Sequence, residues 1–384
     1  MKEKLALRVL GDIMGWSDER ATQEFRWLSL MSRLKYDGYH DFLAGVRFIE
    51  SLANWMQQFE PTDRECAYAF VRSALVYIGP AEMLRLVESF YPEHVQRRLA
   101  RAVAQRHGVS PYRVWAQEKT AGAYDNLLRQ TLFIGLSEGA RLDLFRRANA
   151  RTIRNEQVLL ATYVNEEKWR KLREELASDL GVATDDQRAK FQCVYLIDDF
   201  VASGTTFIRK DAEDGPWKGK LAGFRDTIAN VRESHFESDL TVCVHHHVAT
   251  HRAVGVLEER QRQALDEEGA AQWFTNVEFS YGTILPADLP IDESALDEAR
   301  DFVDLAQRYF DPDDPSTRNK HIEKGGTSAE LGFAGCALPL VLEHNTPNNS
   351  VALLWADTPG NDGGNDEPER HAMRPLFRRR QRHS

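Results

Sequence analysis

A segment in the middle of the chain combines an apolar run, two acidic residues and a loop of small and hydroxyl-bearing residues. The apolar residues Val194 to Ile197 predict a buried strand, and Asp198 and Asp199 follow it directly. A loop of small residues comes next: Ala202, Ser203, Gly204, Thr205 and Thr206. Such a loop, at the start of a helix, presents successive N–H groups and hydroxyls to one point. We therefore expect it to bind a phosphate monoester.

The two aspartates have a different expected role, because a carboxylate repels a phosphate. Asp198 and Asp199 suit the hydroxyls of a ribose attached to that phosphate, or a Mg²⁺ ion held beside it. The alternative interpretation is structural: a buried strand ends in a solvated Asp-Asp turn, and a capped helix follows. The ordered succession of strand, acidic pair and small-residue loop favours the binding site.

A second strand and loop precede this segment in the sequence. The stretch TLFIGL predicts a strand, and Ser137, Glu138 and Gly139 follow it in a glycine-containing turn before the next helix. In open parallel sheets, ligands bind where the loops at the carboxyl ends of two strands diverge. Arg141, and also Arg146 or Arg147, could balance the charge of an anionic ligand there. An ordinary strand-to-helix turn is the alternative.

The elements that would position these residues fall into three predicted regions. Residues 1–120 show helical spacing of apolar residues and predict a helical accessory domain. Residues 121–356 alternate short apolar runs with charged helical stretches, which predicts an α/β domain with a mainly parallel sheet. Residues 357–384 are rich in Gly, Asn and charge, and we expect a largely disordered tail with a basic end.

Composition limits the classes of function. The formal charge of −10 gives no overall support for nucleic-acid binding. The four cysteines are widely spaced, which argues against a disulfide framework or a cysteine zinc site.

The cluster His245, His246, His247 and His251 follows an apolar run, where alternate side chains point to opposite faces. We interpret it as polar residues at a strand end rather than as a metal site.

No apolar run approaches the ~20 residues that a membrane helix needs. The first residues also lack the uninterrupted apolar stretch and cleavage site of a signal peptide. We expect no membrane partner and a cytoplasmic location.

The segment Val194–Thr206 resembles the phosphoribosyl diphosphate (PRPP) binding signature of type I phosphoribosyltransferases. The resemblance implies that Asp198 and Asp199 bind the ribose hydroxyls and that Ala202 to Thr206 bind the 5′-phosphate. It further implies that Ser137, Glu138, Gly139 and Arg141 form the loop that binds pyrophosphate, with Mg²⁺ as cofactor. The reaction implied is pentosyl transfer through an oxocarbenium-like transition state without a protein nucleophile. Lys168, Lys171 or Arg173 could also reach pyrophosphate, or remain solvated.

More of the chain is similar to one branch of this superfamily, the PRTase-CE family associated with bacterial conflict and antiphage systems. The similarity rests on EKWRKLREEL, PWKGKLAGF, HNTPNNSVALLW and the closing RPLFRRRQRHS. It implies phosphoribosyl chemistry in defence, with a protein or nucleic-acid partner plausible. The segment 343–350 would belong to the hood that selects an acceptor, or be a plain turn.

Three functions stay open at this point. The chain could transfer phosphoribosyl groups or hydrolyse PRPP or a nucleotide. It could be a non-catalytic sensor of PRPP or a nucleotide. It could also be an assembly subunit that docks a partner through the arginines of its closing segment, which are Arg374, Arg378, Arg379, Arg380 and Arg382.

Overall fold

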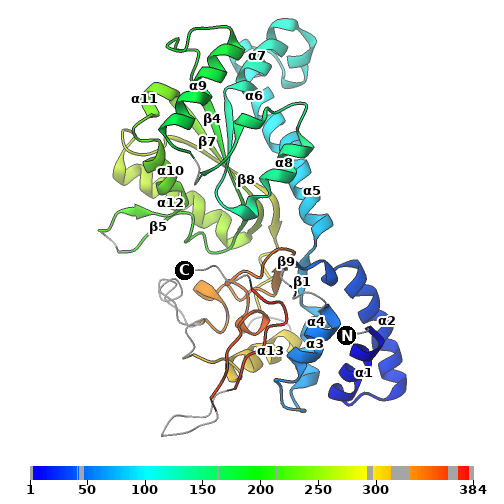
Figure 1. The fold of residues 1–384 in the computed structure, drawn as a ribbon. Helices are drawn as coiled ribbons and strands as arrows, with labels where there is room; N and C mark the ends of the chain where they lie inside the picture. The colour runs from blue at the N-terminus through cyan, green and yellow to red at the C-terminus, as the bar shows by residue number, and fades with distance from the viewer. Residues whose placement is uncertain are drawn as a thin grey trace. The chain divides into compact units, whose positions relative to one another are not determined.

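The structure is a computed structural model that describes residues 3–40, 42, 47–161, 164–212, 214–291, 297–312, 329–361 and 371–379. The chain divides into two compact units (Figure 1). One unit is Leu84–Leu285, and the other combines Met1–Met83 with Pro286–Ser384.

The unit Leu84–Leu285 is built on a five-stranded parallel sheet. Its strands have the order β3-β2-β4-β7-β8. Their bounds are β2 Thr131–Gly135, β3 Val158–Leu160, β4 Phe191–Val201, β7 Phe236–Thr250 and β8 Asn276–Leu285. The predicted α/β fold with a mainly parallel sheet, flanking helices and N-terminal helices is confirmed.

Helices cover both faces of this sheet because successive strand residues point to opposite sides. On β4, Val194 and Leu196 belong to one core cluster, whereas Cys193 and Tyr195 belong to another. The first face packs against α9 (Glu166–Leu180), α10 (Lys220–Ile228) and α12 (His251–Glu268) (Figure 1). The second packs against α6 (Gln96–His107), α7 (Glu118–Arg129) and α8 (Leu142–Ala148).

Shorter elements join these helices and strands, and the label η marks a short 3-10 or π-helical turn. They are η2 (Tyr91–Val95), η3 (Pro111–Ala116), η4 (Glu138–Ala140), η5 (Asn155–Gln157), β5 (Arg209–Lys210), β6 (Trp217–Lys218) and α11 (Arg232–His235). Strands β5 and β6 pair antiparallel in a small hairpin.

The other unit contains the N-terminal helices and the residues after β8. Its elements are α1 (Glu3–Met14), α2 (Asp18–Leu34), η1 (Tyr36–Gly38), α3 (Phe48–Met56), α4 (Arg64–Ser73), β1 (Val76–Ile78), α13 (Asp297–Arg308), η7 (Phe333–Gly335), β9 (Leu340–Leu342) and η8 (Ala352–Leu354). Strand β1 pairs parallel with β9, so segments far apart in the sequence share one core. In the described part of the chain, no helix combines the length and apolarity needed to cross a membrane.

The division into units differs from the boundaries expected from sequence. The boundary falls inside α5 (Pro80–Phe90), and α6 and α7 belong with the sheet because their apolar stripes cover one of its faces. Residues 286–356 belong instead with the N-terminal helices.

The expected disordered tail also needs correction. Residues 362–370 and 380–384 lie outside the described residues, but Met373, Leu376 and Phe377 are buried in the core formed with the N-terminal helices. Residues 371–379 are therefore part of the folded unit.

Candidate functional site

The acidic pair lies inside a strand rather than after it. Strand β4 continues to Val201, and Asp198 stands opposite His246 of β7 in the sheet register. Asp198 is 2 % exposed, and its carboxylate contacts Ser137 of the loop after β2 and Lys220 at the start of α10. The sequence prediction that the two aspartates end the strand is wrong, because β4 continues for two residues beyond Asp199.

The small-residue loop is not followed directly by a helix. The N–H groups of Phe207 and Ile208 both donate to the carbonyl of Gly204, at 3.0 Å each, and the hairpin β5–β6 comes next. The predicted helix start is therefore wrong, and α10 begins only at Lys220. Phe207 and Ile208 are fully buried, and their burial draws the chain into this turn.

The turn nevertheless leaves several amide groups available. Gly204 adopts φ +73°, which favours glycine, and a Cβ there would lie 3.1 Å from Cγ1 of Val256 on α12. The Thr205 N–H approaches Oγ of Ser203 at 3.3 Å. The N–H groups of Ser203, Gly204 and Thr206 have no intramolecular acceptor within the described residues. The loop can therefore offer N–H groups to an anion, although without a helix dipole behind them.

Two contacts join the loop after β2 to the aspartates of β4. Strand β2 pairs with β4, and Gly135 stands opposite Ile197. The Ser137 hydroxyl donates to Oδ1 of Asp198 at 2.6 Å. At Gly139, an added Cβ would lie 2.6 Å from Cγ of Asp199, so only a glycine lets this carboxylate pack against the backbone. The structure thus brings together the two loops that the sequence predicted to be neighbours.

Lys220 completes this group and was not identified from the sequence as a site residue. Its ammonium forms an ion pair with Oδ2 of Asp198. The backbone N–H of Lys220 donates to the carbonyl of Thr206 at 3.1 Å. The preceding Gly219 has φ +112°, and a Cβ there would lie 2.7 Å from the carbonyl carbon of Phe207. Lys220 lies in the segment PWKGKLAGF, which carries part of the family resemblance, but its approach to Asp198 depends on the hairpin.

Burial controls the ionisation of Asp198. The pKa of this carboxyl is raised to about 6, mainly because burial disfavours the charged form, and the positive charge of Lys220 partly offsets this increase. The neighbouring charge of Asp199 raises the pKa further, while hydrogen bonds from Lys220 and Ser137 lower it. Both carboxylate oxygens of Asp198 are thus engaged within the protein, one by a hydroxyl and one by an ammonium group.

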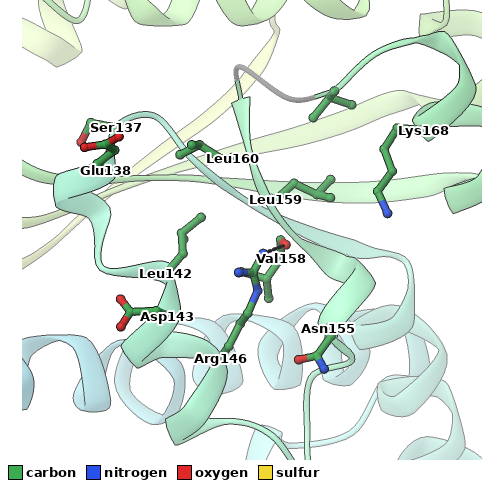
Figure 2. A pocket seen from close by; sticks show the side chains of 11 residues that line it. Ser137, Glu138, Leu142, Asp143, Arg146, Asn155, Val158, Leu159, Leu160 and Lys168 are labelled. Carbon is green, nitrogen blue, oxygen red and sulfur yellow. Dashed lines mark hydrogen bonds between the residues drawn. The ribbon is translucent and has the colours of Figure 1, made fainter.

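A pocket of about 490 Å³ adjoins the loop after β2 (Figure 2). Ser137 and Glu138 line it together with Arg146 of α8 and Lys168 of α9. Strand β3 supplies an apolar wall through Val158, Leu159 and Leu160. The Arg146 guanidinium donates to the carbonyl of Val158 (Figure 2).

The other basic residues considered from sequence have different surroundings. Arg141 precedes α8 with φ +54°, a left-handed conformation that is uncommon outside glycine. Lys171 pairs with Glu167 at 2.8 Å, and Arg147 pairs with Asp143 at 2.6 Å. Lys171, Arg147 and Arg173 do not line this pocket, whereas Lys168 does.

The histidine cluster is buried in β7 and does not follow the strand. His245, His246 and His247 are at most 1 % exposed, and only His251 lies beyond the strand, as the first residue of α12. The ring of His246 packs edge-on against Phe207, with centroids 5.3 Å apart. Among the described residues, no group of three His, Cys, Asp or Glu side chains could hold a metal ion. The expectation of polar strand-end residues is therefore corrected: the three histidines are core residues of the strand.

The candidate acceptor segment 343–350 belongs to the other unit. Glu343 pairs with His40 at 3.0 Å, and the Asn349 amide donates to the carbonyl of Phe333 at 3.1 Å. These two polar side chains hold their own unit together, and a role in acceptor selection stays a prediction.

Comparison with known proteins agrees with the fold. Neither the curated proteins nor the solved structures gave a match. A family model described as PRTase-CE matches residues 52–379, which covers the sheet, both loops and Lys220. The chain therefore belongs to the PRTase-CE family, whose members are phosphoribosyltransferase-like proteins.

Proposed function

We propose that this protein binds PRPP, or a related ribose 5-phosphate nucleotide, together with Mg²⁺. It then transfers the phosphoribosyl group or hydrolyses a nucleotide-related substrate in a bacterial defence system. The observation that carries the proposal is the meeting of two loops at adjacent strand ends. Ser137 contacts Asp198, Gly139 contacts Asp199, and the N–H groups of Ser203 and Gly204 remain available one turn away.

Each part of the ligand has a matching set of groups. The amides and hydroxyls of Ala202 to Thr206 would hold the 5′-phosphate, because consecutive N–H groups form a nest for an anion. Asp199, on β4 shortly before this loop, would accept hydrogen bonds from the ribose hydroxyls. The loop of Ser137, Glu138, Gly139 and Arg141 would hold the diphosphate, with Lys168 at the edge of the adjoining pocket.

Asp198 and Lys220 would act on this ligand mainly through charge. The ion pair between Lys220 and the buried Asp198 would keep a carboxylate beside the ribose and a cation beside the phosphates of the bound ligand. An approaching diphosphate competes with Asp198 for Lys220, so ligand binding would partly release the carboxylate. Asp198 would then be available to the ribose hydroxyls or to Mg²⁺.

The residues present fit a Mg²⁺ ion that the ligand itself would largely hold. Mg²⁺ commonly binds through one or two carboxylates, substrate phosphates and water rather than in a cage of protein ligands. Asp198 and Asp199 supply such carboxylates on one strand end. When bound, Mg²⁺ would neutralise charge on the leaving diphosphate.

The protein's own contribution to catalysis would be alignment and electrostatics. Departure of diphosphate from the anomeric carbon leaves positive charge on the ribose ring, which the carboxylates of Asp198 and Asp199 would stabilise. The loop amides fix the 5′-phosphate, so the ring is oriented for attack by an acceptor or water. No covalent intermediate with a side chain is required.

A non-catalytic sensor of the same ligand is the second candidate. The observation that favours it is the internal engagement of Asp198, whose oxygens are both occupied by Ser137 and Lys220. Binding that redistributes these contacts would change the loops after β2 and β4 without any reaction. A third candidate is partner docking by the closing arginines. Of these, Arg378 pairs with Asp357 at 3.2 Å and Arg379 lies over Trp355.

Isothermal titration with PRPP and Mg²⁺ tests the binding site. We expect saturable binding by the wild-type chain and none by Asp198→Ala plus Asp199→Ala. A matched control is Glu174→Ala plus Glu175→Ala, which removes the same charge from the exposed face of α9 and should bind normally. Equal binding by all three proteins would refute the site.

Pyrophosphate release separates the enzyme from the sensor. We expect release from PRPP on addition of bacterial cell extract, and no release with the Asp198→Ala plus Asp199→Ala protein. Saturable PRPP binding without release would establish the sensor instead.

A further inference from the structure

One helical segment of the sheet-containing unit is rich in basic residues. Residues 96–119, which form α6, η3 and the start of α7, contain six Lys or Arg residues and one acidic residue. The whole chain, by contrast, carries a formal charge of −10. This segment is therefore a local positive region in an acidic protein.

The packing of α6 directs part of this charge into solvent. Leu99, Ala100 and Val103 form its buried stripe, and Arg97 and Arg101 lie one turn apart on the exposed face. Gly108 ends α6 with φ +64° and turns the chain into η3, which packs against both α6 and α7. Arg113 and Lys119 are exposed on this turn.

Two aromatic side chains stand on the same turn. Tyr112 is 76 % exposed and Trp115 is 49 % exposed. Val114 between them is fully buried, and the Thr120 hydroxyl donates to its carbonyl at 2.6 Å, so the turn is anchored. The Trp115 ring rests edge-on against Tyr124, with centroids 4.5 Å apart.

Anchored aromatic rings flanked by cations bind unpaired bases and phosphates together. Exposed rings stack on bases, and nearby Arg and Lys side chains contact the backbone. A base-paired duplex would leave no free base faces for these rings. We infer that the surface of η3 and the start of α7, which carries the exposed side chains of Tyr112, Arg113, Trp115 and Lys119, binds single-stranded nucleic acid.

This surface is separate from the proposed PRPP site. Arg106, at the end of α6, donates to the side chain of Gln192 at 2.8 Å, and Gln192 lies at the beginning of β4. Asp198 and the small-residue loop lie at the opposite end of that strand. The two sites can therefore be tested independently.

Fluorescence anisotropy with labelled 20-nucleotide oligo-dT, a matched single-stranded RNA and a 20-base-pair duplex tests the inference on the full chain. We expect saturable binding of the single strands at 50 mM salt and weaker binding of the duplex. Tyr112→Ala plus Trp115→Ala should weaken single-strand binding at least tenfold, whereas Tyr112→Phe plus Trp115→Phe should retain it. Because Tyr112 and Trp115 are exposed, these variants should keep the wild-type fold, and circular dichroism checks this. A loss of binding with an unchanged spectrum then reports on the surface itself.

Charge variants test the phosphate contacts. Arg113→Gln plus Lys119→Gln should reduce the slope of log affinity against log salt by about 1.4, because each phosphate contact with a single strand contributes ~0.7. The control Arg170→Gln plus Lys171→Gln removes the same charge from α9 and should leave binding unchanged. Absence of binding, equal binding of duplex and single strand, or equal loss with the α9 control would overturn the inference.

Discussion

At the scale of single residues, the candidate site depends on the ion pair between Asp198 and Lys220. The ion pair joins a carboxylate that is 3 % exposed to an ammonium that is 32 % exposed. Removal of one partner from a buried pair leaves the other charge without compensation, which costs more than the pair itself contributes. The sequence placed Asp198 in a functional loop, but 22 residues and a hairpin separate it from Lys220.

We predict that Lys220→Met lowers the free energy of unfolding at pH 8 by about 2 kcal/mol, discounted for the exposure of the ammonium. The charge of Lys220 lowers the pKa of Asp198, so its loss leaves a higher pKa. The deficit should shrink as pH falls towards about 6, because Asp198 of the variant, with its higher pKa, takes up a proton before that of the wild type and then needs no counter-charge.

Denaturant unfolding at pH 8 and pH 5 measures this effect. Asp198→Asn in the Lys220→Met background should recover part of the loss, and Lys218→Met, which removes an exposed ion pair with Asp211, should change stability little. A deficit of the same size at both pH values would contradict the charge argument.

At the scale of elements, β2, β4 and β7 bring the site residues together through register. Pairing of β2 with β4 puts the turn at Gly139 beside Asp199, and pairing of β4 with β7 puts His246 opposite Asp198. The apolar pattern of each strand is readable in the sequence, but the register between strands is a long-range property. The burial of His246 therefore could not be inferred from its position after an apolar run.

We predict that Gly139→Ala weakens PRPP binding at least tenfold and destabilises the fold by about 1–3 kcal/mol, because the new methyl group displaces the Asp199 carboxylate. Gly122→Ala on α7 is the control, since a Cβ there meets no atom within 4 Å. It should leave binding unchanged and raise stability slightly. Titration calorimetry and thermal unfolding of both variants check this; tight binding by Gly139→Ala would show that the turn does not contact the ligand.

The buried histidines of β7 predict loss of stability in acid. Burial lowers the pKa of His246 to about 3, and it lowers the pKa of His245 well below its usual value. In the unfolded chain these rings titrate near 6.5. As pH falls below about 6.5, the unfolded chain therefore gains protons that the folded chain does not, and unfolding becomes more favourable.

We predict that His246→Gln reduces the steepness of this loss by up to about 1.4 kcal/mol per pH unit, the value for one proton. Asp198 opposes the trend, because burial raises its folded-state pKa to about 6 and the folded chain takes up its proton first. Unfolding free energies at pH 7.5, 6.5 and 5.5 provide the comparison. Parallel pH profiles for the wild type and His246→Gln would rule out the ring as a source of the loss.

For the whole molecule, the path of the chain joins distant segments in one unit. Residues near both ends of the sequence share a core, in which Phe377 lies 5.1 Å from Tyr39 and 5.7 Å from Phe48 between ring centroids. The composition after Asp357 indicated disorder, because its Gly, Asn and charged residues outnumber its apolar ones. A few well-placed apolar side chains were enough to bring residues 371–379 into the fold.

We predict that Phe377→Ala lowers the free energy of unfolding by about 3–5 kcal/mol, through lost burial and the cavity that remains. Arg374→Ala is the control, because its side chain is exposed, and it should change stability by less than about 0.5 kcal/mol. Calorimetric unfolding of both variants checks the prediction. Equal transitions for Phe377→Ala and Arg374→Ala would mean that the closing segment does not support this core.

The sequence alone determined the α/β class, the strand that carries Asp198 and Asp199, and the two small-residue loops, because hydrophobic periodicity and glycine placement are local properties. Tertiary structure decided which groups meet those residues. Lys220 reaches Asp198 across a hairpin, Gly139 fits against Asp199 through strand pairing, and Phe377 returns to the N-terminal helices. Such contacts depend on sheet register and chain path, which no local pattern encodes.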